Sequence, residues 1–138
     1  MGSRRKAREV ALQLLYQNEF NPGKIEESLT HFWREGELDE KALAFAGDLV
    51  QGALDNLEDL DGQISESSQN WRLTRMAVID RNIMRLAVYE FLYTPETPKK
   101  VVINEAIEIA KRFSTQDSTQ FINGILDNIR KLLEAKAS

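Results

Sequence analysis

Apolar residues recur at steps of three and four along most of the chain, and short polar segments separate these stretches. This spacing places the apolar side chains on one face of an α-helix. We therefore predict an all-α protein, a compact bundle of about six or seven helices. The predicted helices cover the chain up to residue 20, residues 24–33, 39–60, 72–93 and 102–113, and a last helix from about residue 117.

Glycine, proline and acidic residues mark the predicted helix ends. Asn21-Pro22-Gly23 is a strong stop signal, and Glu35-Gly36-Glu37 ends the second helix. Thr94-Pro95 ends the helix over 72–93, and Asp61-Gly62 predicts a break or bend after the long third segment. Helix and loop thus alternate over the whole sequence.

Val101, Val102 and Ile103 are β-branched and look strand-like in isolation. Two of them, however, belong to a longer apolar stripe with helical spacing that reaches Phe113. The longer periodicity favours a helix here.

The composition is that of an ordinary globular protein, with 138 residues, 42% hydrophobic and 29% charged. This length predicts a single domain over residues 1–138. The sequence has no cysteine and one histidine, His31, which we interpret as a surface residue, so thiolate chemistry is excluded and histidine-pair zinc sites are improbable. We expect no membrane span, no signal peptide and no cofactor, and we place the protein in the cytoplasm.

Charge is divided unevenly along the chain. Residues 1–10 carry Arg4, Arg5, Lys6 and Arg8 against Glu9, a formal charge of +3. Because the net charge of the whole chain is −4, the remaining residues carry −7. A basic patch on an acidic body is typical of a domain that meets a polyanion at one place. The alternative is a frayed, solvated tail.

Helical spacing after the basic cluster favours a packed helix over a tail. Ala7, Val10, Ala11 and Leu14 follow at helical steps. Cations at a helix start oppose the helix dipole, so a purely structural helix would prefer acidic residues there. Arginine side chains one turn apart present forked donors that suit phosphates. We predict an anion-binding role for this cluster.

The polar segment 114–118 lies between two apolar helices, and by default it caps the last helix through a side-chain oxygen. Phe121 follows one turn later. Its periodicity favours the core, but an exposed ring there would stack on a nucleobase. Carboxylate pairs such as Glu26-Glu27 and Glu58-Asp59 are interpreted as solvated surface, and no catalytic residues or metal ligands are predicted.

Four stretches, in this order, resemble the NusB family: RRKAREVALQLLY at 4–16, VIDRNIMRLAVYE at 78–90, INEAIEIAKRF at 103–113, and DS at 117–118 followed by FINGILD at 121–127. The resemblance implies a fold of two small helical sub-bundles. It also implies transcription antitermination, with binding to the single-stranded boxA element of nascent ribosomal RNA, to NusE, which is a small ribosomal subunit protein, and to the RNA polymerase antitermination complex. Residues 24–75 match the family only in helical pattern.

The resemblance also implies roles for individual residues. RNA contacts fall to Arg4, Arg5, Lys6 and Arg8, with Asp117, Gln120 and Phe121 at the RNA-proximal end of the last helix; Tyr16, Asp80 and Arg81 lie toward NusE. Four cations on single-stranded RNA predict a log–log salt slope of about −3. Some family members self-associate through the RNA-binding surface, so a homodimer stays open.

Two other functions compete with the adaptor. The first is the RNA-binding part of a ribosomal RNA cytosine methyltransferase, which needs a methyltransferase domain and a cysteine nucleophile that we do not expect here. The second is a helical protein-interaction module whose basic end docks an acidic partner. Replacing Arg4, Arg5 and Arg8 discriminates this module from the adaptor, because RNA binding by the module would not depend on them.

Overall fold

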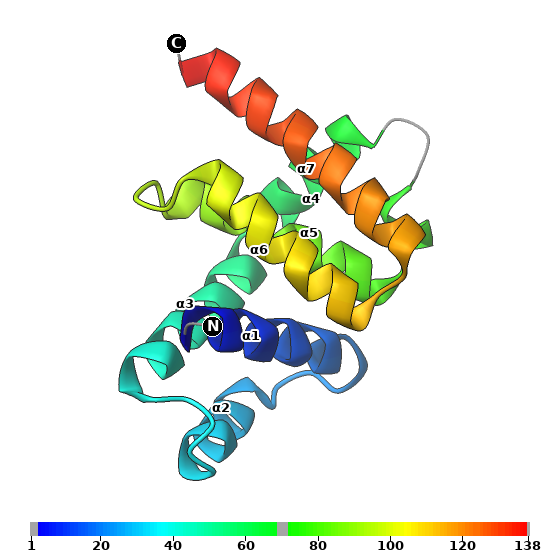
Figure 1. Ribbon diagram of the computed structural model, residues 1–138. Helices are drawn as coiled ribbons and strands as arrows, with labels where there is room; N and C mark the ends of the chain where they lie inside the picture. The colour runs from blue at the N-terminus through cyan, green and yellow to red at the C-terminus, as the bar shows by residue number, and fades with distance from the viewer. Residues whose placement is uncertain (1–2, 69–71, 138) are drawn as a thin grey trace. The chain divides into compact units, whose positions relative to one another are not determined.

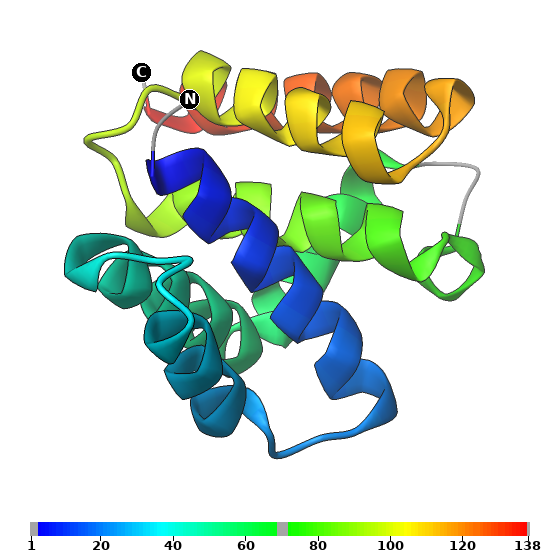
Figure 2. The ribbon, with the colours of Figure 1, turned by 60° about the horizontal axis from the view of Figure 1, so that its bottom comes forward.

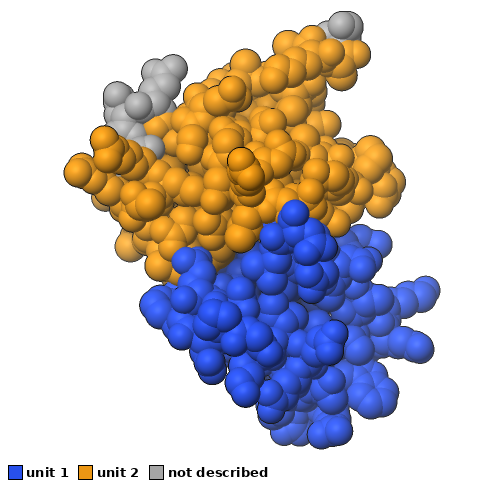
Figure 3. All heavy atoms as spheres, turned by 180° about the vertical axis from the view of Figure 1, so that it is seen from behind, with its two compact units in different colours: residues 1–55 blue, residues 56–138 orange. Residues whose placement is uncertain are grey.

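The computed structural model describes residues 3–68 and 72–137. Over these ranges the chain forms seven α-helices and one short 3-10 helix, with no strand (Figure 1). The helices fall into two compact units, residues 1–55 and residues 56–138 (Figure 3). The predicted all-α fold in two small sub-bundles is confirmed.

Unit 1 holds α1 (Ser3–Phe20), α2 (Ile25–Arg34) and α3 (Glu40–Asp55), each of which contacts the other two. The α1–α3 pair is the most extensive of these contacts. Small residues on the buried stripes let helices approach closely. The buried stripes include Ala7, Val10, Ala11 and Leu14 on α1 and Ala46, Leu49, Val50 and Ala53 on α3.

Both predicted stop signals in unit 1 are confirmed. Gly23 and Gly36 have φ values of 92° and 72°, a conformation that other residues adopt only with strain. After α2, the Gly36 amide donates to the Trp33 carbonyl and the Glu37 amide donates to the Phe32 carbonyl, each at 3.1 Å. These bonds occupy carbonyls that the helix end leaves without intrahelical partners.

Unit 2 holds α4 (Leu57–Ser67), the 3-10 helix η1 (Leu73–Arg75), α5 (Val78–Tyr93), α6 (Lys99–Phe113) and α7 (Gln116–Ala137). Helix α5 contacts α4, α6 and α7, and α6 runs beside α7 (Figures 1 and 2). The run at 101–103 lies in α6, so the helical prediction for it is confirmed. The buried side chains include Ile64, Ile83, Met84, Val88, Phe91, Ile122, Leu126 and Ile129.

The prediction of one long helix over 39–60 is wrong. Helix α3 ends at Asp55, and α4 begins at Leu57 after Asn56, which has φ −123° and ψ 22°. Gly62, where we expected the break, lies inside α4. Burial of Leu60 and Ile64 in α4 outweighs the intrinsic cost of that glycine, about 1 kcal/mol.

The helix predicted over 72–93 is also too long. Leu73–Arg75 forms a separate 3-10 helix, Met76 and Ala77 are extended, and α5 begins at Val78. A step of three between apolar residues suits a 3-10 turn as well as an α-helix, which is why the pattern alone did not separate the two.

Two residues of the predicted apolar stripes are exposed. Phe113 ends α6 with 45% of its surface accessible, and Leu132, in the last turns of α7, has 43% accessible. At a helix end fewer neighbours remain to cover a side chain. The Phe113 ring instead lies 5.2 Å from the guanidinium carbon of Arg112.

Candidate nucleic-acid interface

The basic cluster forms the first two turns of α1, which has no acidic residue in its first turn. Arg4 is exposed, and Arg5 and Lys6 are partly buried. Arg8 has only 7% of its surface accessible. The prediction of a packed helix is therefore confirmed, whereas the RNA contacts of the four side chains stay predictions.

Phe45 on α3 holds two of these arginines. The guanidinium carbon of Arg4 lies 4.4 Å from the centroid of the Phe45 ring, and that of Arg8 lies 5.2 Å away. The negative face of an aromatic ring attracts a cation at these distances. Sequence analysis missed Phe45, which falls outside the main apolar stripe of its helix and is only partly buried.

Lys6 is held differently, by a carboxylate. Its Nζ lies 3.7 Å from Glu37 Oε1, and both side chains are about two-fifths exposed. Glu37 follows Gly36 in the loop after α2, and the next residue, Leu38, is 3% exposed and anchors that loop. This acidic partner was also missed by sequence analysis.

The second candidate surface lies in unit 2, at the start of α7. Thr115 Oγ1 accepts a hydrogen bond of 3.0 Å from the Ser118 amide, which confirms the predicted cap. Asp117 and Gln120 are exposed, and Phe121 is partly buried. Phe121 is thus neither fully in the core nor fully open.

An open pocket of about 440 Å³ adjoins this helix start. Asp80 is 4% exposed and accepts a 2.6 Å hydrogen bond from Ser114 Oγ, which ties α5 to the segment before α7. Two carboxylates and one guanidinium border a mainly apolar floor. The pocket is lined by Arg75, Met76, Ala77, Asp80, Asp117, Ser118 and Phe121.

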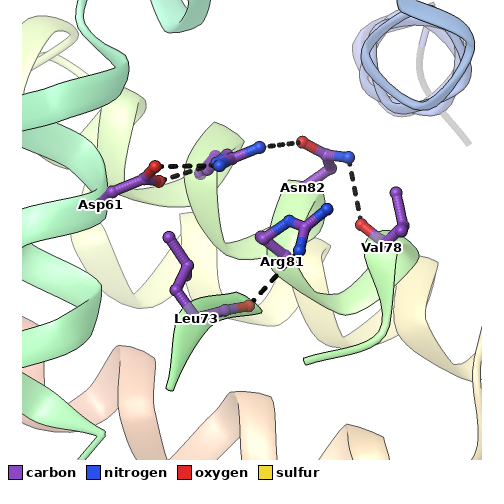
Figure 4. A network of polar contacts seen from close by, with 6 residues as sticks. Asp61, Leu73, Val78, Arg81 and Asn82 are labelled. Atoms are coloured by element: carbon purple, nitrogen blue, oxygen red, sulfur yellow. Dashed lines mark hydrogen bonds and ion pairs between the residues drawn. The ribbon is translucent and has the colours of Figure 1, made fainter. Parts of the chain in front are cut away.

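A polar network holds two of the elements that line the pocket, η1 and α5 (Figure 4). Arg85 donates to both carboxylate oxygens of Asp61, at 2.7 and 2.9 Å, and to Asn82 Oδ1 at 3.1 Å. Asn82 donates to the Val78 carbonyl at 3.0 Å, and Arg81 to the Leu73 carbonyl at 3.4 Å. The network joins α4, η1 and α5.

The residues assigned to the partner surface differ in accessibility. Tyr16 is 39% exposed, and its ring centroid lies 5.0 Å from that of Phe20, which is 66% exposed. Arg81 is partly buried, and Asp80 is buried. Sequence analysis did not single out Phe20, which enlarges the aromatic surface at the end of α1.

Within the described ranges, no group of three or more His, Cys, Asp or Glu side chains is placed to hold a metal ion. Over the same residues, no helix combines the length and the hydropathy that crossing a membrane requires.

The fold and the two surfaces define a small all-α protein with a basic helix start suited to a polyanion and a pocket that includes one aromatic ring, Phe121. The NusB family model matches residues 5–131, and the chain belongs to the NusB family. The transcription antitermination protein NusB of Geobacter sp. (strain M21) is 44% identical over 144 residues, with 99% of each chain covered.

Solved structures agree with this assignment. The structure of T. maritima NusB matches with a TM-score of 0.78 and 41% identity, covering 93% of this chain and 90% of that one. The fold is also shared by the NusB chain matched in a crystal structure of antitermination factors NusB and NusE with double-stranded RNA. That match has a TM-score of 0.83 and 24% identity, and it covers 94% and 97% of the two chains.

Proposed function

We propose that this protein is a transcription antitermination factor that binds the boxA element of nascent ribosomal RNA together with NusE, within an RNA polymerase complex. The observation that carries the proposal is the basic start of α1, where Phe45 holds two arginines. Membership of the NusB family supports it, because the relatives are named as transcription antitermination proteins.

In unit 1, Arg4, Arg5 and Lys6 contact RNA phosphates, and most of the affinity and its salt dependence come from them. Arg8 is nearly buried, so it contributes a positive potential behind the exposed cations rather than a large contact area. Arginine is suited to this role because its forked donors match two phosphate oxygens.

In unit 2, the pocket at the start of α7 receives a splayed base. The Phe121 ring offers a stacking face, and the Asp117 carboxylate accepts a hydrogen bond from a base N–H group. Gln120 adds a donor and an acceptor at the exposed rim. Two carboxylates, Asp80 and Asp117, make this pocket better suited to a base edge than to a phosphate.

NusE contacts Tyr16 in unit 1 and, separately, the start of α5 in unit 2, where Asp80 and Arg81 lie. A partner that brings its own RNA contacts raises the overall affinity through effective concentration. The role is one of binding rather than catalysis, and it is carried out in the cytoplasm, where RNA polymerase works. A homodimer through the RNA surface would compete with RNA.

Fluorescence anisotropy of a boxA RNA and a scrambled RNA, with and without NusE, tests this function. We expect NusE to tighten binding of boxA RNA more than binding of the scrambled RNA. We also expect a log–log salt slope no steeper than about −3, since each contact to a single-strand phosphate contributes about −0.7. Equal binding of both RNAs in the presence of NusE, or no RNA binding at all, would contradict the proposal.

Glu37 should limit RNA affinity, because its carboxylate competes with phosphate for Lys6. We expect Glu37→Gln to tighten boxA binding roughly two- to fourfold, in line with the strength of an exposed ion pair. Glu35→Gln is the matched control, since it removes the same charge from the same exposed loop. Equal effects of the two substitutions would assign the gain to net charge alone.

A further inference from the structure

Phe45 is the one aromatic side chain in the described part of the chain that lies against two residues of the basic cluster. It comes from α3, whereas the cluster belongs to α1, so the contact depends on the packing of these helices within unit 1. Both guanidinium groups lie within about 6 Å of its centroid, the range of a cation–π interaction.

An aromatic ring and a carboxylate both attract a cation, but only the carboxylate offsets its positive charge. Glu37 cancels much of the charge of Lys6, and phosphate must displace it or share the lysine. The Phe45 ring carries no net charge, so Arg4 keeps its full positive charge while its side chain is restrained. Within the described residues, no carboxylate pairs with Arg4.

We propose that Phe45 is a positioning residue for RNA binding. Its ring orders the Arg4 guanidinium and leaves its N–H donors and its charge for the RNA backbone. Arg8, one helical turn from Arg4, contacts the same ring and helps to keep the ring in place. The proposal rests on the proposed function, because it explains how the same basic surface is prepared for RNA.

Ordering before binding raises affinity. An unrestrained arginine side chain loses conformational entropy when it binds a phosphate, because several of its bonds stop rotating. A side chain that is already held in place loses less. Loss of the ring should therefore weaken RNA binding roughly three- to tenfold, the range expected when one exposed arginine side chain is no longer restrained before binding.

The test measures boxA RNA binding by the full protein with NusE. Phe45→Leu removes the ring but keeps an apolar side chain, and Phe45→Tyr keeps the ring. Phe113→Leu is the matched control, since it removes a ring that lies 5.2 Å from Arg112 in unit 2. We expect Phe45→Leu to bind three to ten times more weakly, and we expect Phe45→Tyr and Phe113→Leu to bind like the wild type.

Two readouts separate positioning from a structural role. Loss of an ordered phosphate contact makes the log–log salt slope shallower by up to about 0.7, whereas partial unfolding lowers only the active fraction. In an Arg4→Ala background, Phe45→Leu should have little further effect on affinity, because coupled residues are not additive. Additive effects with an unchanged slope would overturn the proposal.

Pentafluorophenylalanine at position 45 serves if Phe45→Leu does not fold, as judged by circular dichroism. Fluorination keeps the ring's shape but reverses the charge distribution that attracts cations, so affinity should fall as in Phe45→Leu. Unchanged affinity would overturn the positioning role while leaving RNA binding intact. Absence of RNA binding by the wild type would instead refute the proposed function itself.

Discussion

Replacing Arg4 and Arg5 together with alanine is expected to weaken binding to boxA RNA about a hundredfold. In the proposed function each side chain would supply a charge-assisted hydrogen bond to phosphate, which contributes about 1.5 kcal/mol or more, and about 1.4 kcal/mol is a factor of ten. Fluorescence anisotropy at fixed salt measures the change. The salt slope should become shallower by about 1.4, the value for two contacts to a single strand.

The matched control for this pair is Lys100→Ala with Lys136→Ala, which removes two exposed positive charges from unit 2. Both double variants change the net charge equally. If the control weakens RNA binding as much as the arginine pair, RNA responds to overall charge and the start of α1 is not its site. Arg8 is kept in both variants, because its burial would mix a folding effect with a binding effect.

Breaking the Asp61–Arg85 ion pair is expected to give the second large effect, on stability. The two side chains are 26% and 12% exposed, and the pair is bidentate. Asp61→Ala leaves the Arg85 guanidinium partly desolvated without its carboxylate, which should lower the free energy of unfolding by about 2 kcal/mol. Urea denaturation followed by circular dichroism measures this loss.

Asp127→Asn provides a contrast with a more exposed carboxylate, 40% against 26% for Asp61. The partner of Asp127, Arg130, is about as buried as Arg85. Asp127 pairs with Arg130 and Lys131 within α7, and the hydrogen bond from Arg130 does most to hold the pKa of this carboxyl below its usual value. Its small contribution to stability is therefore present at neutral pH and is lost as pH falls through that lowered pKa. A loss in Asp127→Asn equal to that in Asp61→Ala would show that burial of the carboxylate does not set the size of the effect.

The sequence pattern predicted the helix ends correctly where a glycine turn in the sequence itself stops the helix. Gly23 and Gly36 adopt positive φ, and the sequence marks both positions plainly. The boundary at Asn56 was not predictable in this way, because Leu54, Leu57 and Leu60 keep a step of three across it. Only packing distinguishes a continuous helix from two helices that share one phase.

The candidate site, too, has residues that the local sequence indicates and residues that only the packing brings together. The arginines are adjacent in sequence, and the resemblance to a family named them. Phe45 and Glu37 lie more than thirty positions away along the chain from Lys6, and only the α1–α3 packing and the loop after α2 bring them near. No spacing rule connects such residues, so their contacts needed the three-dimensional structure.

The loop after α2 has a consequence for how RNA affinity can evolve. The Gly36 turn, the amide bonds to Phe32 and Trp33, and the burial of Leu38 fix the backbone around position 37 whatever side chain it carries. If Lys6 contacts RNA as proposed, a substitution at this position would therefore change the RNA affinity while the arginines and the fold stay unaltered.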